Sequence, residues 1–306
     1  MLYNLDMENK YDVIIIGAGP AGLSSAIYTA RANLKTLIIE ANSEGGKLVN
    51  ISNIENYPGF KEISGYELAN NFINQVKSLN VEIINNEVIK IEPNKVVLND
   101  KTQLKTKSII IATGSKERKL DLDKANEYIG KGISYCATCD GFFFRNKPVC
   151  VIAENTNALQ ESLYLANLAS KVTMITRKDK LIGDEKTIST ILNNEKIELL
   201  TNTTPINLII KDDKLIGLTV KDDNDNQFDI DCLGIFPYIS FNPSTVFLDQ
   251  SILDEKGFVV VDKNCETAIK GIYAAGDCIS KDLRQVVTAC ADGAIAASHI
   301  IKTIKK

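Results

Sequence analysis

The sequence predicts an α/β protein with two Rossmann-like (three-layer ββα) dinucleotide-binding domains, the second inserted into the first. Two observations lead to this fold: a complete βαβ fingerprint near the N-terminus, and a second βαβ unit that repeats its spacing in mid-chain. A linker-like stretch before the second unit and prolines after it mark where the chain leaves the first domain and returns. We therefore expect a discontinuous domain over residues 1–118 and 247–306, and an inserted domain over residues 119–246.

The first βαβ unit begins with Tyr11–Gly17, a short β-branched apolar run that is typical of a strand buried on both faces. Gly17-Ala-Gly-Pro-Ala-Gly22 follows at once, and then a predicted helix over Leu23–Asn33 and a strand over Lys35–Glu40. In such a loop the first glycine allows the tight turn, the second lets the backbone approach a pyrophosphate, and the third lets helix and strand pack closely. The acid Glu40 at the end of the second strand suits a pair of ribose hydroxyls.

Loops and regular elements alternate after this unit. Glu44-Gly-Gly-Lys-Leu48 and Ile54-Glu-Asn-Tyr-Pro-Gly-Phe60 are rich in glycine and proline, and they predict loops that could wrap a large cofactor. An amphipathic helix is expected next, followed by three β-like stretches and a basic, polar linker. These elements cover Tyr66–Leu79, Val81–Glu92, Lys95–Leu98, Lys107–Thr113 and Lys116–Lys124.

Cys136 and Cys139 form a Cys-x-x-Cys pair, and Asp140 follows directly. Two thiols at this spacing can close a tight, reducible disulfide, and a neighbouring carboxylate can move a proton to or from a thiolate. The alternative, half of a zinc site, would need two further ligands. The sequence has no second Cys-x-x-Cys, and its single histidine, His299, lies near the far end. The position of the pair between two dinucleotide-fold segments favours redox chemistry.

The second βαβ unit corresponds to the first when the sequence is shifted by 136 residues. The shift superimposes the strand Pro148–Ala153, the helix Asn157–Ala169 and the strand Lys171–Thr176 on their counterparts. The remaining elements are expected to be a helix, a strand, a hairpin, three more strands and a last helix. They cover Glu185–Leu192, Lys196–Leu200, Ile206–Val220, Phe228–Phe236, Gly257–Val261, Gly271–Ala275 and Arg284–Ile301.

The glycines of the first loop have no counterparts in the second. Ala153-Glu-Asn155 stands where the first unit has Gly17-Ala-Gly19. Side chains at these positions oppose a bound pyrophosphate, and Glu154 adds a charge of the same sign. We therefore expect the second fold to be kept and its nucleotide site to be lost. Arg177 and Lys178 oppose this interpretation, because they could still hold a phosphate.

Composition excludes several classes of protein. With 306 residues, 44% of them hydrophobic and 24% charged, the chain is expected to be a globular protein with sizeable cores. No apolar stretch is long enough to span a bilayer, and the polar N-terminus does not resemble a secretory signal. We therefore expect a cytoplasmic protein without membrane contact. The net charge of −4 argues against nucleic-acid binding.

Several motifs occur together in the order found in one known family. They are the glycine loop, Glu55-Asn-Tyr-Pro-Gly-Phe60, Ala112-Thr-Gly114, Tyr135–Phe144, Gly271-Ile-Tyr-Ala-Ala-Gly-Asp277 and Arg284-Gln285. With this set the chain resembles the low-molecular-weight thioredoxin reductases over nearly its whole length. The resemblance implies a homodimer that holds FAD in the discontinuous domain and reduces thioredoxin. It also implies that Cys139 lies nearer the flavin, Cys136 attacks the thioredoxin disulfide and Asp140 moves the proton.

The same resemblance implies a set of FAD-binding residues and no metal site. They lie in the glycine loop, at the end of the second strand and in the loops after it, at the ends of two later strands, and at the start of the last helix. They are Gly17, Gly19, Pro20, Ala21, Gly22, Glu40, Ala41, Gly46, Lys47, Leu48, Asn56, Val88, Ala112, Thr113, Gly114, Gly276, Asp277, Arg284, Gln285, Val286 and Ala289.

The departures from this family concern the pyridine nucleotide. Ordinary members have a glycine-rich NADPH motif where this chain has Ala153-Glu-Asn155, and a His-Arg-Arg turn where it has Thr176-Arg-Lys178. A further family arginine is replaced by Ile182 and a glycine by Ser240. The FAD and disulfide motifs are intact. This pattern resembles the clostridial ferredoxin-dependent flavin thioredoxin reductases, which implies reduced ferredoxin as the electron donor.

Three alternatives stay open at this point. The first is an NADPH-dependent thioredoxin reductase with a divergent NADPH site, which Arg177 and Lys178 support. The second is a relative that passes electrons to a different disulfide protein. The third is a non-catalytic flavin-binding regulatory protein, against which the set Cys136–Asp140 argues, because a binding role needs no such pair of thiols and acid.

Overall fold

The computed structural model describes residues 10–51 and 54–305, so residues 1–9 and 306 of the expected first domain lie outside the described part. The chain divides into two compact units: unit 1 comprises residues 1–116 and 242–306, and unit 2 comprises residues 117–241. The crossings therefore follow residues 116 and 241, where 118 and 246 were expected. Both fall within short strands, β7 (Ser115–Glu117) and β15 (Phe241–Pro243), which pair with each other. The polar stretch Lys116–Lys124 lies near the first crossing, and Pro237 and Pro243 lie near the second.

Unit 1 is built on a seven-stranded sheet in the order β3-β2-β1-β6-β5-β4, with β16 also beside β6. Its strands are β1 (Lys10–Ile16), β2 (Thr36–Glu40), β3 (Glu82–Asn85), β4 (Val88–Glu92), β5 (Lys95–Leu98), β6 (Gln103–Ile111) and β16 (Ile272–Ala274). The first three, β6 and β16 are parallel, whereas β5 is antiparallel to both β4 and β6. The carboxyl ends of the parallel strands share one edge, which is where open sheets of this kind bind ligands.

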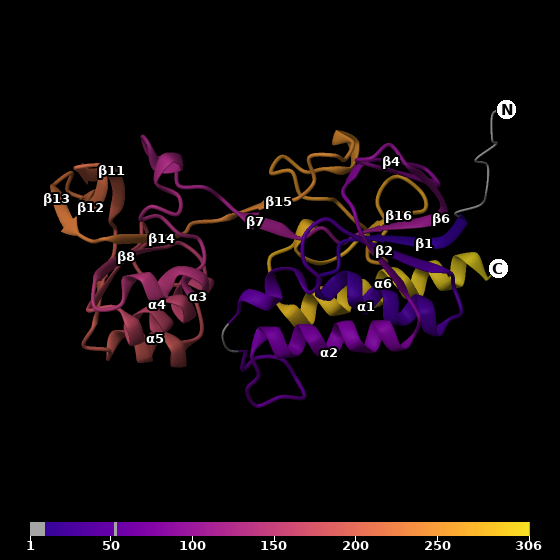
Figure 1. The fold of residues 1–306 in the computed structure, drawn as a ribbon, viewed down its shortest axis with the longest axis horizontal. Helices are drawn as coiled ribbons and strands as arrows, with labels where there is room; N and C mark the ends of the chain where they lie inside the picture. Colours follow the sequence, from indigo (N-terminus) through magenta and orange to yellow (C-terminus); the bar gives the residue numbers. More distant parts are fainter. Residues whose placement is uncertain (1–9, 52–53, 306) are drawn as a thin grey trace. The chain divides into compact units, whose positions relative to one another are not determined.

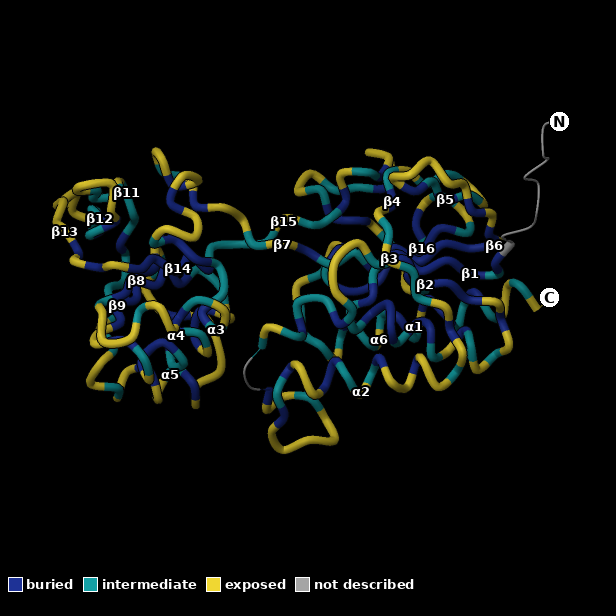
Figure 2. The backbone as a smooth tube through the Cα atoms, viewed as in Figure 1, coloured by how far each residue is buried: buried dark blue, intermediate teal, exposed yellow. Residues whose placement is uncertain are grey.

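Alternate residues of β1 enter two separate cores. Val13 and Ile15 pack with the helices α1 (Pro20–Arg31), α2 (Gly65–Ser78) and α6 (Val286–Ile304). Ile14 and Ile16 pack on the opposite face, with residues of β4, β5 and the segment 248–279. Figure 1 shows the three helices on one side of these strands, and Figure 2 shows the strands as the buried centre of the unit. The apolar run was correctly expected to be buried on both faces.

Unit 2 has a parallel sheet, β10-β9-β8-β14, and an antiparallel sheet, β11-β12-β13. The strands are β8 (Pro148–Ala153), β9 (Lys171–Ile175), β10 (Ile197–Leu200), β11 (Thr204–Lys211), β12 (Lys214–Lys221), β13 (Gln227–Asp231) and β14 (Gly234–Tyr238). The helices are α3 (Ala137–Asp140), α4 (Asn157–Leu168) and α5 (Glu185–Leu192). Across both units, no helix in the described ranges is long and apolar enough to cross a membrane.

The segment that leads into the cysteine pair is attached to the free edge of β14. Ile235 donates its N–H to the carbonyl of Gly132 at 2.8 Å, and Ser134 donates its N–H to the carbonyl of Ile235 at 3.0 Å. Pro237 lies inside β14, where it is tolerated because edge strands leave one row of backbone groups out of the ladder. The start of the redox motif is therefore fixed by backbone hydrogen bonds to the sheet.

Three expected strands are wrong in detail. Val81–Glu92 is two strands, because Asn86 breaks off and donates its N–H to the carbonyl of Glu40 at 3.0 Å. Phe228–Phe236 is also two strands, β13 and β14, which belong to different sheets. Gly257–Val261 forms only isolated bridges at Val259, because the chain turns tightly at Gly257, which has a φ of +82°.

Candidate functional site

Cys136 and Cys139 are joined by a disulfide in unit 2. Cys136 directly precedes α3, and Cys139 is exposed whereas Cys136 is half-buried. The backbone N–H of Cys139 donates to Cys136 Sγ at 3.2 Å, and the Thr138 hydroxyl lies 3.3 Å from the same sulfur. A thiolate formed at Cys136 would therefore have two polar groups beside it, which favours the charged form of a cysteine.

A single hydroxyl ties Asp140 to the start of this motif. Ser134 Oγ donates to Asp140 Oδ2 at 2.7 Å and accepts from the N–H of Cys136 at 3.1 Å. Ser134 therefore joins the Asp140 carboxylate to the backbone of Cys136, the first residue of the disulfide. Ser134 and Thr138 were not predicted, although their positions beside the cysteines in the sequence were a signal.

A second acid lies behind the motif, and sequence reasoning missed it. The N–H of Ala137 donates to Tyr238 Oη at 3.2 Å, and Tyr238 Oη donates to Glu161 Oε2 at 3.4 Å. Desolvation raises the pKa of Glu161 to about 7. Burial and the Glu161 charge raise the pKa of Tyr238 still further above its usual value. The signal in the sequence was an acid on the inner stripe of α4, three residues after buried Ala158.

The glycines of the first loop have different roles. Gly17 has a φ of +107°, and a Cβ on it would lie 2.4 Å from the carbonyl oxygen of Ala112. A Cβ on Gly22 would lie 1.9 Å from the carbonyl oxygen of Gly17, whereas a Cβ on Gly19 would meet nothing within 4 Å. Gly17 and Gly22 are therefore required by packing, and Gly19 leaves its backbone accessible on an open side. An open backbone at this point of a βαβ unit fits a dinucleotide pyrophosphate.

The carboxylate of Glu40 is bound to this loop. Ala18 donates its N–H to Glu40 Oε2 at 2.7 Å, and Asn42 donates its N–H to Oε1 at 2.8 Å. Gly45 donates its N–H to the carbonyl of Ala18 at 2.8 Å. The segment that carries the predicted residues Ala41, Gly46, Lys47 and Leu48 is therefore anchored to the glycine loop.

Lys47 connects this loop to two more strand ends. Its Nζ lies 3.2 Å from Ser115 Oγ and 4.0 Å from Asp277 Oδ2. The predicted residues Ala112, Thr113 and Gly114 lie between β6 and Ser115, and Gly276 and Asp277 follow β16. A cation at this edge suits the phosphates of a dinucleotide.

The other predicted cofactor residues take different places. Asn56 Nδ2 donates to Gln285 Oε1 at 3.1 Å, which brings the loop after β2 to the start of α6. Arg284 is already engaged, because its guanidinium lies over the Phe258 ring at 4.3 Å and donates to the carbonyl of Ile279 at 3.2 Å. Pro20, Ala21 and Gly22 form the first turn of α1, and Val286 and Ala289 lie in the first two turns of α6. Val88 begins β4 and is buried in the core opposite the three helices.

Asp292 supports this edge and was also missed. It accepts the N–H of Gly276 at 3.1 Å and forms an ion pair with Lys281 at 2.5 Å. Both charged side chains are largely buried, which makes the pairing geometry important. Asp292 lies within α6, in a stretch that the sequence identified only as a helix.

The counterpart loop in unit 2 holds its own carboxylate. Glu154 Oε1 accepts the N–H of Arg177 at 2.8 Å and its Nε at 3.2 Å, and the side chain of Glu154 is only 5% exposed. Lys178 Nζ donates to the carbonyl of Glu154 at 3.1 Å. The two cations that could have held a phosphate are therefore bound to Glu154 in this structure.

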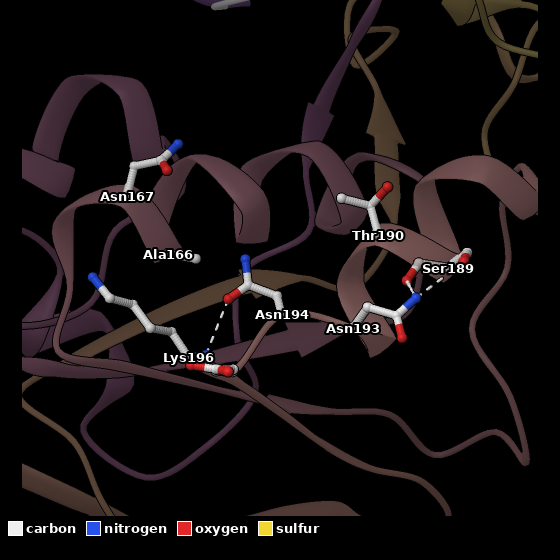
Figure 3. Close-up of a pocket in the computed structure, with 8 residues that line it drawn as sticks. Ala166, Asn167, Ser189, Thr190, Asn193, Asn194 and Lys196 are labelled. Carbon is white, nitrogen blue, oxygen red and sulfur yellow. Dashed lines mark hydrogen bonds between the residues drawn. The ribbon is translucent and has the colours of Figure 1, made fainter.

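A polar depression in unit 2 holds none of the predicted residues. Figure 3 shows it, with a volume of about 790 Å³, lined by Ala166, Asn167, Ser189, Thr190, Asn193, Asn194, Glu195 and Lys196. Within the described ranges, no group of three or more His, Cys, Asp or Glu side chains is arranged to hold a metal ion.

Comparison with known proteins adds a family to this geometry. Residues 11–293 match the family described as pyridine nucleotide-disulphide oxidoreductase. The chain is 40% identical to the thioredoxin reductase of Bacillus subtilis, over 96% of this chain and 94% of that protein. Among solved structures, it is 38% identical to Lactococcus lactis thioredoxin reductase (FR conformation), with a TM-score of 0.93 over 96% and 99% of the two chains. A ferredoxin-flavin thioredoxin reductase from Clostridium acetobutylicum matches at 29% identity and a TM-score of 0.52, over 97% and 98%.

Proposed function

Because this chain belongs to the pyridine nucleotide-disulphide oxidoreductase family, and within it to the thioredoxin reductases, we propose that it reduces the disulfide of thioredoxin through FAD and the Cys136–Cys139 pair. The family is FAD-dependent, so FAD is the cofactor of this chain. The observation that carries the proposal is the disulfide itself, with the Asp140 carboxylate fixed close to it by Ser134. This constellation is what thiol–disulfide exchange with proton transfer requires.

The carboxyl-end edge of the unit 1 sheet has the features that FAD needs. We assign the pyrophosphate to the open backbone at Gly19, with the cation Lys47 nearby. We assign the rest of the cofactor to the loop after Glu40, to the stretch Ala112–Gly114 and to the start of α6 at Gln285. When bound, FAD supplies the two electrons that reduce the disulfide.

The thiol steps then follow from the chemistry of the pair. Reduction breaks the S–S bond and leaves two sulfur groups, one of which takes a proton from Asp140. The Cys136 thiolate attacks one sulfur of the thioredoxin disulfide, forming a mixed disulfide and releasing the other thioredoxin sulfur as a thiolate. Cys139 returns its proton by way of Asp140 and then attacks Cys136 Sγ as a thiolate, which reforms the Cys136–Cys139 disulfide and releases reduced thioredoxin.

Single cysteine variants test the two roles. Cys139→Ser leaves Cys136 as a nucleophile without a resolving partner, so it should accumulate a mixed disulfide with thioredoxin on a non-reducing gel. Cys136→Ser should form none, and both variants should lose thioredoxin reduction while keeping bound FAD. Because Cys139 is the more exposed sulfur here, the reverse trapping pattern would exchange the two roles. Normal turnover by both variants would refute the proposed reaction.

For the electron donor we propose reduced ferredoxin in place of NADPH. The support is the loop Ala153–Asn155, which carries the buried carboxylate of Glu154 where the first unit has bare backbone. The carboxylate holds Arg177, and the backbone carbonyl of Glu154 holds Lys178. A buried carboxylate here opposes the approach of a phosphate, and both cations already have partners. The clostridial ferredoxin-flavin enzyme among the structural relatives is consistent with this proposal.

An anaerobic titration of the flavin absorbance tests the donor. NADPH, NADH and reduced ferredoxin are added in turn to the purified protein. Bleaching with ferredoxin alone is the expected result. Prompt bleaching by NADPH would instead assign the chain to the NADPH-dependent enzymes with an altered loop. Homodimer formation and a cytoplasmic location stay predictions from the family resemblance, and sedimentation of the FAD-loaded protein tests the first.

A further inference from the structure

We propose that Glu161 is a proton-accepting positioning residue of the Cys136–Cys139 centre, which acts on the pair through Tyr238 and the peptide N–H of Ala137. The inference rests on the proposed thiol–disulfide chemistry and adds a second acid to it. Asp140 lies on the same short segment as the cysteines, whereas Glu161 belongs to α4 and approaches that segment from the core of unit 2. The two acids therefore reach the centre from different elements.

The contacts run without a break from the acid to the motif. Glu161 Oε2 accepts a hydrogen bond from Tyr238 Oη at 3.4 Å. Tyr238 Oη in turn accepts one at 3.2 Å from the N–H of Ala137, the residue directly after Cys136. Ala137 is 0% and Tyr238 4% exposed, so water does not compete strongly for these bonds. Hydrogen bonds in such dry surroundings transmit a change of charge more strongly than they would in water.

The neighbours of Glu161 place the pKa of its carboxyl near neutral pH. Desolvation raises the pKa of its carboxyl, and the hydrogen bonds from Tyr238 and Ala137 lower it by less. Glu117 of β7 adds a like charge, which raises the pKa of Glu161 further. The groups that face the carboxyl are therefore Tyr238 from β14, Glu117 from β7 and the peptide of α3, with Cys136, Cys139 and Asp140 beyond it. Near neutral pH the carboxyl can take up or release a proton during the reaction.

In this scheme the uptake of protons balances the change in charge. Two electrons break the S–S bond, one sulfur takes a proton from Asp140, and the other is left as a thiolate. The new negative charge raises the pKa of Glu161, so Glu161 takes one proton from solvent. Asp140 also recovers its proton from solvent, so two protons enter with the two electrons and the centre gains no net charge. When the thiolate attacks thioredoxin, its charge passes to the departing thioredoxin sulfur, and Glu161 releases its proton. Glu161 and the thiolate therefore titrate as a coupled pair.

The test is the pH dependence of alkylation of the reduced protein. The FAD-loaded protein is reduced with dithiothreitol and desalted anaerobically, and the rate of iodoacetamide labelling is followed from pH 5 to 9, with mass spectrometry assigning the labelled cysteine. Only the thiolate reacts. Glu161→Gln removes the neighbouring charge, so the apparent pKa of the faster-reacting cysteine should fall by about one pH unit. Labelling at pH 6.5 should then increase up to about tenfold.

Further variants separate this role from a merely structural one. Tyr238→Phe keeps the Glu161 charge but removes the hydroxyl link, so its profile should lie between those of the wild type and Glu161→Gln. Glu198→Gln removes an equal charge at an exposed ion pair with Lys171 in the same unit, and its profile should match the wild type. A Glu161→Gln profile that superimposes on the wild type would overturn the inference and leave the proposed function intact. If no cysteine of the pair became reactive on reduction, the proposed function itself would fail.

Discussion

The two βαβ units share a topology and a contact between the glycine-loop position and the end of the second strand. In unit 1 the carboxylate of this contact comes from the strand end, and in unit 2 it comes from the loop. In unit 1, the loop after β1 offers the N–H of Ala18 to Glu40 at the end of β2. In unit 2, the loop after β8 carries the acid, and Glu154 accepts the N–H of Arg177 after β9. The first arrangement keeps a bare backbone at the loop, and the second fills it with an anion. Under the proposed function, the fold alone does not decide whether a phosphate can approach; the position of one carboxylate does.

The inner faces of the two helices differ in the same way. At the shift of 136 residues, Ser25 of α1 corresponds to Glu161 of α4. Ser25 is fully buried and donates to the carbonyl of Ala21, close to Gly293 of α6, so it only fills a tight helix contact. Glu161 faces the redox segment and stays titratable. Under the proposals made above, unit 1 binds the cofactor and unit 2 carries the charge changes.

The largest effect on stability and flavin content is expected from a substitution at Gly22 in the loop of unit 1. Gly22→Ala places a Cβ 1.9 Å from the Gly17 carbonyl oxygen, so it should cost about 3 kcal/mol of stability and the bound FAD. Flavin absorbance per protein and thermal unfolding measure both losses. The matched change in unit 2, Ala158→Gly, should keep full flavin content. A flavin-replete Gly22→Ala protein would show that the two loops are more alike than proposed.

A pH change should destabilise the protein through Glu161. Its pKa is raised in the folded protein from 4.5 to about 7, so the folded state binds more protons than the unfolded state between these values. The stabilisation that Glu161 contributes should therefore be fully present below pH 4.5 and be lost as the pH rises through about 7. After allowance for solvent screening, the loss is about 2 kcal/mol between pH 5 and pH 8. Glu161→Gln should not show this loss in thermal unfolding, and an equal loss in the variant would contradict the assignment.

The lost glycines can be restored as a test of the donor proposal. The triple variant Ala153→Gly, Glu154→Gly and Asn155→Gly removes the anion and frees the Arg177 side chain. It should bind NADPH about tenfold tighter or more than the wild type by calorimetry, a change of about 1.4 kcal/mol. Glu154→Gln alone removes the charge but keeps a side chain at the loop, so it should gain less. No gain in the triple variant would mean that the site was lost elsewhere as well.

The smallest effects are expected from neutralising the two carboxylates themselves. Glu40→Gln weakens two hydrogen bonds from backbone N–H groups and should cost about 1 kcal/mol of stability. Glu154→Gln loses an ion pair whose arginine is 54% exposed, so it should cost about 0.5 kcal/mol. The free energy of unfolding, measured at low and high salt, separates the two costs, since only the cost of Glu154→Gln should become clearly smaller as the salt concentration rises. Equal salt dependence would remove this difference between the units.

The parts of the fold that the sequence predicted are those fixed by local pattern. The strand Pro148–Ala153 and the helix Glu185–Leu192 have the predicted limits, because apolar runs and polar ends mark them directly. The boundary between β13 and β14 could not be predicted, since Cys232 and Leu233 continue the apolar pattern while the chain changes sheets. The different roles of Gly17, Gly19 and Gly22 could not be predicted either, because they depend on what a Cβ at each position would meet in the fold.

The candidate site likewise has a part that the local sequence predicts and a part that only the tertiary packing reveals. The cysteine pair and Asp140 are adjacent in the sequence, so their proximity needed no fold. Glu161 could be recognised as an acid on the inner stripe of α4, but its link to the cysteine pair could not, because Ala137 and Tyr238 are 101 residues apart and meet only through the packing of α3, α4 and β14. Contacts at such separation leave no periodicity or spacing in the sequence that would reveal them.

The covered edge of β14 bears on how the protein resists self-association. An exposed strand edge is a template on which another chain can add a strand, and aggregation often starts there. Gly132 and Ser134 use the backbone groups of Ile235 on this side, and Pro237 has no N–H to offer. The stretch that delivers the cysteines to their place therefore also closes the sheet to incoming strands. Shortening this stretch should therefore lower the solubility of the protein as well as its activity.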